Sequence, residues 1–119
     1  MSEKNINDLI TSARQEGDAV IVAIRGEIDL HNSPDLRNHM LKHLSDGSIK
    51  RLVLNLTEVP YMDSSAIAVF VEALQKLRKI GGKIYLTNLQ PRVKGLLEIA
   101  RLDTIFIVCV DETAALASS

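Results

Sequence analysis

Two kinds of apolar pattern alternate along the chain. In one kind, aliphatic and β-branched residues follow one another in short runs, which is typical of strands. In the other, apolar residues recur every three or four positions, which is typical of helices packed on one side. Strands are predicted at 6–14, 19–24, 51–56, 83–87 and 105–110, and helices at 34–46, 64–80, 91–100 and from 111 onward.

The order of these elements predicts an α/β fold. A turn at Glu16-Gly17-Asp18 joins the first two strands into a hairpin, and strands then alternate with helices. Such alternation with short connections favours a mixed sheet that is parallel in its later part, with right-handed crossovers. We therefore expect one domain over residues 1–119, with four to five strands packed against about four helices.

Local signals predict where the helices begin and which side they bury. Ser33 is expected to cap the first helix, with Pro34 in its first helical position. In the central helix, one apolar stripe is expected to face the sheet. Its members are Ile67, Phe70, Ala73, Leu74, Leu77 and Ile80.

Composition excludes several classes of function. The chain has 119 residues, a formal net charge of −1 and a pI near 6.3, so it lacks the basic surface that nucleic-acid-binding domains usually carry. Its polar N-terminus and the lack of an apolar segment of about 20 residues predict neither secretion nor a membrane span. We expect a cytoplasmic protein with no nucleic-acid or membrane partner.

Cys109 is the only cysteine, so an intramolecular disulfide is excluded, and its apolar surroundings predict a buried structural thiol.

A polar trio stands between the buried strand at 51–56 and the central helix. Asp63, Ser64 and Ser65 occupy the position where a helix needs hydrogen-bond acceptors for its free N–H groups. One interpretation is therefore capping by Asp63 or Ser64. The other is that Ser64 or Ser65 accepts a phosphate, because helix N-termini tolerate negative charge. The capping interpretation and the phosphoacceptor interpretation are compatible with each other.

Two histidine patterns have simpler interpretations. His39 and His43 lie four residues apart on one predicted helix and could chelate a metal from one face, but no third ligand at a diagnostic spacing accompanies them. A solvated helix face is the preferred interpretation, with no metal and no cofactor. A hydrolase built on Ser64, His31 and Asp29 would lack the glycines of a nucleophile elbow, so we expect no enzyme.

The order of motifs resembles the STAS domain family, in particular the anti-sigma-factor antagonists of bacterial partner-switching systems. The resemblance covers nearly the whole chain. It rests on Gly26-Glu27-Ile28-Asp29, Leu52-Val53-Leu54-Asn55-Leu56, Met62-Asp63-Ser64-Ser65, Gly81-Gly82-Lys83 and Pro91-Arg92-Val93. One position departs, because the family usually has glycine where this chain has Ala66.

The resemblance implies a function. Ser64 would be the phosphoacceptor, with Ser65 as the alternative, and the unphosphorylated chain would bind an anti-sigma factor that has serine kinase activity. Phosphorylation would release that partner, and a serine phosphatase of the metal-dependent class would restore binding. The implied partner surface consists of Gly26, Glu27, Asp29, His31, Asp63, Ser64 and Ser65. The alternative is a STAS module that does not switch, as a scaffold subunit of a signalling or transport complex.

Overall fold

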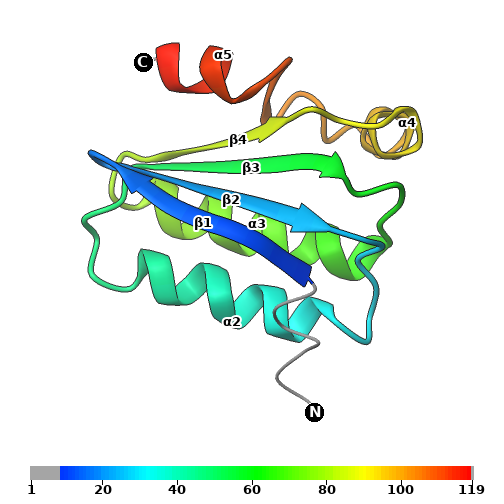
Figure 1. Ribbon diagram of the computed structural model, residues 1–119, viewed down its shortest axis with the longest axis horizontal. Coiled ribbons are helices and arrows are strands. Elements are labelled where there is room, and N and C mark those ends of the chain that lie inside the picture. The colour runs from blue at the N-terminus through cyan, green and yellow to red at the C-terminus, as the bar shows by residue number, and fades with distance from the viewer. Residues whose placement is uncertain (1–8, 119) are drawn as a thin grey trace.

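A five-stranded sheet with helices on both faces forms the molecule, as Figure 1 shows for the computed structural model, which describes residues 9–118. The strands and helices alternate after the first hairpin, as predicted. The strands are β1 (Ile10–Glu16), β2 (Ala19–Arg25), β3 (Arg51–Glu58), β4 (Lys83–Thr87) and β5 (Ile107–Cys109). The helices are α2 (Ser33–Leu44), α3 (Ser64–Arg78), α4 (Pro91–Ile99) and α5 (Glu112–Ala117).

The sheet is mixed, which confirms the expected fold class. The strands lie in the order β1-β2-β3-β4-β5. β1 and β2 pair antiparallel, and the pairs β2–β3, β3–β4 and β4–β5 are parallel. Because β2 and β3 are parallel neighbours, the loops that follow their carboxyl ends emerge at the same edge of the sheet. That edge carries the candidate site.

Side chains of β3 are buried on both faces of the sheet because successive residues of a strand point to opposite sides. Leu52, Leu54 and Leu56 belong to the main core, and Val53 belongs to a second, smaller core on the other face. This explains why the strand is a nearly unbroken apolar run rather than an alternating one.

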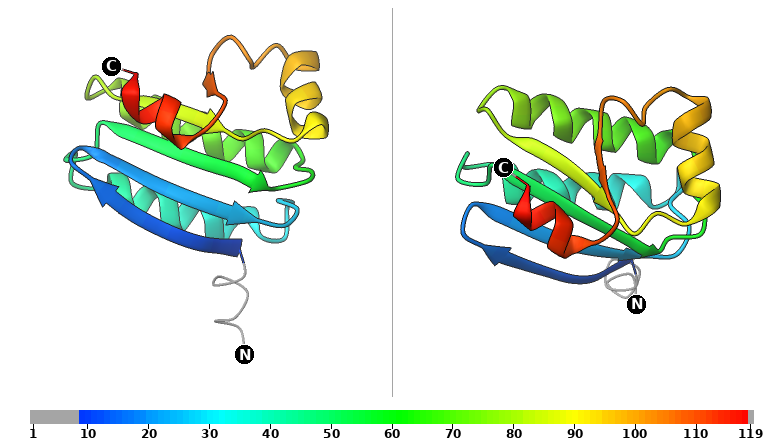
Figure 2. Two further views of the ribbon diagram at one scale, coloured as in Figure 1. Left: turned by 45° about the horizontal axis from the view of Figure 1, so that its top comes forward. Right: turned by 90° about the horizontal axis from the view of Figure 1, so that it is seen from above.

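Different helices pack against the two cores. In Figure 2, α2 and α3 lie on one face of the sheet and α5 lies on the other, while α4 sits past the carboxyl end of β4. Phe70 of α3 is fully buried and meets Phe106 edge to face, with the ring centroids 6.3 Å apart. The position of α3 is thereby fixed by the main core.

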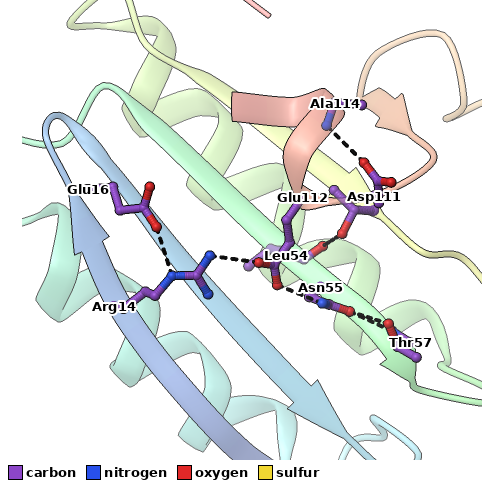
Figure 3. A network of polar contacts seen from close by, with 9 residues as sticks. Arg14, Glu16, Leu54, Asn55, Thr57, Asp111, Glu112 and Ala114 are labelled. Carbon is purple, nitrogen blue, oxygen red and sulfur yellow. Dashed lines mark hydrogen bonds and ion pairs between the residues drawn. The ribbon is translucent and has the colours of Figure 1, made fainter. Parts of the chain in front are cut away.

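A polar network attaches α5 to the sheet. The carboxylate of Glu112 accepts hydrogen bonds from Arg14 at 2.8 Å and from Asn55 at 2.7 Å, as Figure 3 shows. At the other end of the helix, the Arg51 guanidinium donates to the carbonyl of Leu116 at 2.9 Å. These contacts hold the C-terminal helix against the sheet.

The start of α2 differs from the prediction. Its N-cap is Asn32, and Ser33 is the first helical residue, so Pro34 occupies the second helical position. Ser33 is buried. Asn32 takes the cap position because its side chain is engaged by the preceding loop, where its Oδ1 accepts from the Asp29 N–H at 2.9 Å.

The ends of the chain also differ in detail. Residues 6–8 of the first predicted strand lie outside the described residues, and β1 begins at Ile10. β5 is shorter than the predicted 105–110 and is mostly exposed. Cys109 is half-buried rather than buried, and both burial and the nearby Asp111 raise the pKa of its thiol, so it stays protonated.

The buried side of α3 is rotated slightly from the prediction. Phe70, Ala73, Leu74 and Leu77 are buried as expected, but Ile67 is half-buried and Ile80 lies beyond the end of the helix. Ala66 and Val69 complete the buried stripe instead. The apolar side of the helix therefore begins at its first turn, directly beneath the polar trio.

Candidate functional site

The loop after β2 and the segment before α3 are joined by backbone hydrogen bonds. The Ile28 N–H donates to the Tyr61 carbonyl at 3.2 Å, and the Asp63 N–H donates to the Ile28 carbonyl at 3.0 Å. Ile28 and Met62 pair as an isolated parallel bridge, and both side chains are fully buried. Two motifs more than 30 residues apart in the sequence thus form one continuous surface.

The loop over 26–32 is held in shape by its own polar groups. The Asp29 carboxylate accepts the backbone N–H of His31 at 2.9 Å and that of Asn32 at 3.2 Å. The Asn32 amide donates to the Glu27 carbonyl at 2.9 Å. Gly26 begins the loop with a φ of +88°, a conformation that favours glycine. These contacts leave Glu27, Asp29 and His31 exposed.

Asp63 caps α3. Its Oδ1 accepts the Ser65 N–H at 2.9 Å and the Ser65 hydroxyl at 2.5 Å. The hydroxyl of Ser65, together with the backbone N–H groups of Ser65, Ala66 and Leu30, lowers the pKa of Asp63 despite the opposing effect of burial. Asp63 is therefore an anion that connects the start of α3 to the loop after β2.

The two serines have different environments. Ser64 is the first residue of α3 and is exposed, whereas Ser65 is half-buried with its hydroxyl bound to Asp63. Side chains of neighbouring helical residues project about 100° apart. The side chain of Ser65 therefore points toward the Asp63 carboxylate, and that of Ser64 points in a different direction. The geometry presents the Ser64 hydroxyl to the solvent.

Comparison with known proteins identifies the family. A model of the STAS domain matches residues 11–116. The chain belongs to the STAS domain family. The anti-sigma-B factor antagonist of Bacillus subtilis is 35% identical over 101 residues, which cover 85% of this chain and 88% of that protein. The antagonist of the same name from Listeria monocytogenes is 32% identical over 101 residues, covering 84% of this chain and 87% of that protein.

Solved structures show the same fold at lower identity. The crystal structure of an anti-sigma factor antagonist from Mycobacterium paratuberculosis has a TM-score of 0.82 with 23% identity, covering 93% of this chain and 94% of that one. The Bacillus cell fate determinant SpoIIAA in its phosphorylated form has a TM-score of 0.69 with 19% identity, covering 87% and 94%. The expected STAS architecture is thereby confirmed.

All seven residues predicted for the partner surface of this STAS domain lie at the same edge of the sheet. They come from the loop over 26–32 and from the start of α3, the two segments that the Ile28–Met62 bridge holds together. The structure adds Leu30, whose side chain is 76% exposed although it is a large aliphatic residue. The sequence interpretation did not include Leu30 in this surface. Its position as an aliphatic residue between Asp29 and His31, in an otherwise polar loop, could have indicated it.

A further pair flanks this edge. Arg92, at the start of α4, lies over the ring of Tyr61 with its guanidinium carbon 4.8 Å from the ring centroid. Such a contact is worth about 0.5–1 kcal/mol at an exposed site. The pair ties α4 to the segment that leads into α3, and nothing in the spacing of the two residues predicts it.

Asp29, a member of the hydrolase candidate, serves the loop over 26–32 in this structure. The Asp29 carboxylate is bound to backbone N–H groups of the loop, including that of His31, rather than arranged as the orienting partner of a histidine ring. Within residues 9–118, no group of three His, Cys, Asp or Glu side chains could hold a metal ion. Over the same residues, every helix is too short or too polar to cross a bilayer. What the arrangement offers is a surface with one solvent-facing hydroxyl.

Proposed function

We propose that this STAS domain is an anti-sigma factor antagonist whose binding is controlled by phosphorylation of Ser64. Its contact area, called here the switch surface, consists of Gly26, Glu27, Asp29, Leu30, His31, Asp63, Ser64 and Ser65. The unphosphorylated domain binds an anti-sigma factor with serine kinase activity and so frees the sigma factor. The relatives of that description at 30–35% identity support the assignment.

One observation carries the choice of Ser64. Its side chain is exposed at the first helical position, while the neighbouring Ser65 hydroxyl is already donated to Asp63. A kinase must reach the acceptor oxygen in line with the γ-phosphorus of ATP. An exposed hydroxyl permits that approach, and one held by a carboxylate has to break its hydrogen bond first.

The transfer changes the charge of the switch surface. The Ser64 oxygen forms a bond to the γ-phosphorus of ATP, the bond from that phosphorus to the bridging β-oxygen breaks, ADP leaves, and the hydroxyl proton passes to a base of the kinase. The product carries roughly −1.5 to −2 charges at pH 7. This charge lies beside the Asp63 carboxylate, whose lowered pKa keeps it ionised. A partner that accommodates a neutral hydroxyl next to one carboxylate would then meet two anions and be released.

The fold is expected to tolerate the phosphate. The N-terminus of a helix favours a nearby anion by about 0.3–1 kcal/mol. Ser64 is the first residue of α3, and its side chain lies outside the core. Modification is therefore expected to alter binding rather than folding.

Paired serine variants test the acceptor. We expect Ser64→Ala to bind the anti-sigma factor but to incorporate no phosphate when incubated with that kinase and ATP, as measured by intact-mass spectrometry. Ser65→Ala is the matched control and should still gain one phosphate. Phosphate on Ser64→Ala, or its loss from Ser65→Ala alone, would move the acceptor and refute the assignment.

Binding by the phosphorylated domain tests the switch. We expect its affinity for the anti-sigma factor to fall at least tenfold, measured by calorimetry, with an unchanged far-ultraviolet circular dichroism spectrum. If the phosphorylated and unphosphorylated domains bound with equal affinity, the result would favour the alternative function, a scaffold subunit of a signalling or transport complex. A melted spectrum would show that phosphate acts through unfolding. A serine phosphatase of the metal-dependent class would reset the switch in the cytoplasm, and the domain itself needs no catalytic activity.

A further inference from the structure

Two histidine rings, those of His39 and His43, contact each other on α2. The Nε2 atoms of His39 and His43 are 3.2 Å apart, and the ring centroids are 4.8 Å apart with the planes inclined by 68°. Both side chains are half-buried. The sequence interpretation treated these residues as a solvated helix face, but the structure joins their two Nε2 atoms by a hydrogen bond whose donor depends on the tautomer.

We propose that His39 and His43 form a bidentate site for a borderline divalent transition-metal ion, with Zn²⁺ as the representative case. Zinc binds histidine nitrogens at about 2.0–2.1 Å in tetrahedral geometry. Two such bonds at the tetrahedral angle place the nitrogens about 3.3 Å apart, from the same bond lengths. The separation of 3.2 Å between the two hydrogen-bonded Nε2 atoms therefore matches the bite of the chelate, and an entering ion takes the place of the hydrogen bond.

Binding replaces the contact between the two rings. A histidine donates a nitrogen lone pair to a metal only in its neutral form. For both Nε2 atoms to donate, the ring that carries its proton on Nε2 must carry it on Nδ1 instead. The positive charge of Lys42 opposes a bound cation and limits the affinity.

The rest of the coordination sphere would be water. Among the residues that the structure describes, no third His, Cys, Asp or Glu completes a metal-binding group with this pair. Two imidazoles with open positions suit Zn²⁺, Ni²⁺ and Cu²⁺, whereas Mg²⁺ and Ca²⁺ prefer oxygen ligands. The site shares no residue with the switch surface, so it stands independently of the proposed function.

Titration with Zn²⁺ alone tests the site. We expect the full chain to bind one Zn²⁺ by isothermal titration calorimetry, with ring signals of His39 and His43 shifting in nuclear magnetic resonance spectra, and to show no binding of Mg²⁺. His39→Asn or His43→Asn should lose at least the roughly 10- to 100-fold in affinity that removal of an outer-shell partner causes. His31→Asn is the matched control, because the third histidine lies in the loop over 26–32, and it should bind Zn²⁺ unchanged.

Several outcomes would overturn the proposal. Zinc binding that survives in the double variant of His39 and His43 would place the ligands elsewhere in the chain. Binding lost equally in His31→Asn, or a stoichiometry other than one ion per chain, would exclude a chelate formed by this pair alone. Thermal unfolding separates folding from ligation, since each variant should melt as the parent does without Zn²⁺ and only the parent and His31→Asn should gain stability with it.

Discussion

Replacing Tyr85 by phenylalanine is expected to stabilise this protein. Tyr85 lies in β4, and its side chain is completely buried in the smaller core, together with Ile21, Val53 and Ala115. Its hydroxyl has no hydrogen-bond partner among the described residues. Burial raises the pKa of this phenol, so it remains an uncharged O–H group.

The size of the effect follows from that missing partner. A buried donor or acceptor without a partner costs about 1–3 kcal/mol. Tyr85→Phe removes the oxygen and keeps the ring, so most of this cost is recovered, less a smaller loss from the void that the oxygen leaves. We expect the free energy of unfolding to rise by about 1–2 kcal/mol, which corresponds to about 4–8 °C in melting temperature for a domain of this length.

Urea unfolding of Tyr85→Phe measures this gain, with an unchanged slope showing that the same surface is exposed on unfolding. Tyr61→Phe is the matched control, because Tyr61 is half-buried and is the only other tyrosine of the chain. That variant should stay within about 0.5 kcal/mol of the parent. A loss of 1 kcal/mol or more in Tyr85→Phe would refute the reasoning, since it would mean that an ordered water or another group satisfies the hydroxyl.

Three further predictions concern the glycines and the histidine pair. Gly82→Ala should lose about 1–3 kcal/mol of stability in thermal unfolding, because a Cβ there would lie 2.6 Å from the Lys50 carbonyl oxygen. Gly95→Ala, in α4 where an added Cβ would meet no atom within 4 Å, should gain about 0.5–1 kcal/mol. Because the folded-state pKa values of His39 and His43 are lowered, stability should be fully present above the unfolded value of about 6.5 and decline as pH falls through the folded values. Urea midpoints between pH 7 and pH 5 would show this decline, and replacing both histidines by asparagine should reduce it.

The order and type of the elements were predictable because the apolar period distinguishes strands from helices. The exposure of the last strand, by contrast, was not predictable from its apolar content. The run 105–110 is as apolar as the run in β3, but β5 pairs with β4 alone, and Val108 and Val110 are 41% and 79% exposed. Position at the edge of a sheet is a property of the tertiary arrangement, and the apolar content of one segment does not encode it.

Capping shows a second limit of local patterns. Ser33 before Pro34 has the composition of a helix start, yet Asn32 occupies the cap position. The difference arises from the loop, where Asn32 binds the backbone of Asp29 and Glu27 through its side-chain amide. A residue engaged by the preceding turn sets the point at which the helix begins, and that engagement depends on contacts that only the folded loop supplies.

The sequence predicted which segments meet at the candidate site but not how those segments are connected. Resemblance to the STAS family brought together the loop after β2 and the start of α3. The physical links between them are two backbone hydrogen bonds, from the Ile28 N–H to the Tyr61 carbonyl and from the Asp63 N–H to the Ile28 carbonyl. Neither bond follows from spacing, because the two segments are adjacent only once β2 and β3 are paired.

The same geometry explains why alanine can stand at position 66. Its side chain is fully buried and belongs to the main core, so the methyl group that glycine would lack points away from the solvent. Ser64, two residues earlier, is exposed on the other side of the helical turn. An enzyme that approaches Ser64 from solvent therefore does not meet the Ala66 methyl group. In this chain the departure from the family pattern adds apolar packing beneath the polar trio and leaves access to the proposed acceptor unchanged.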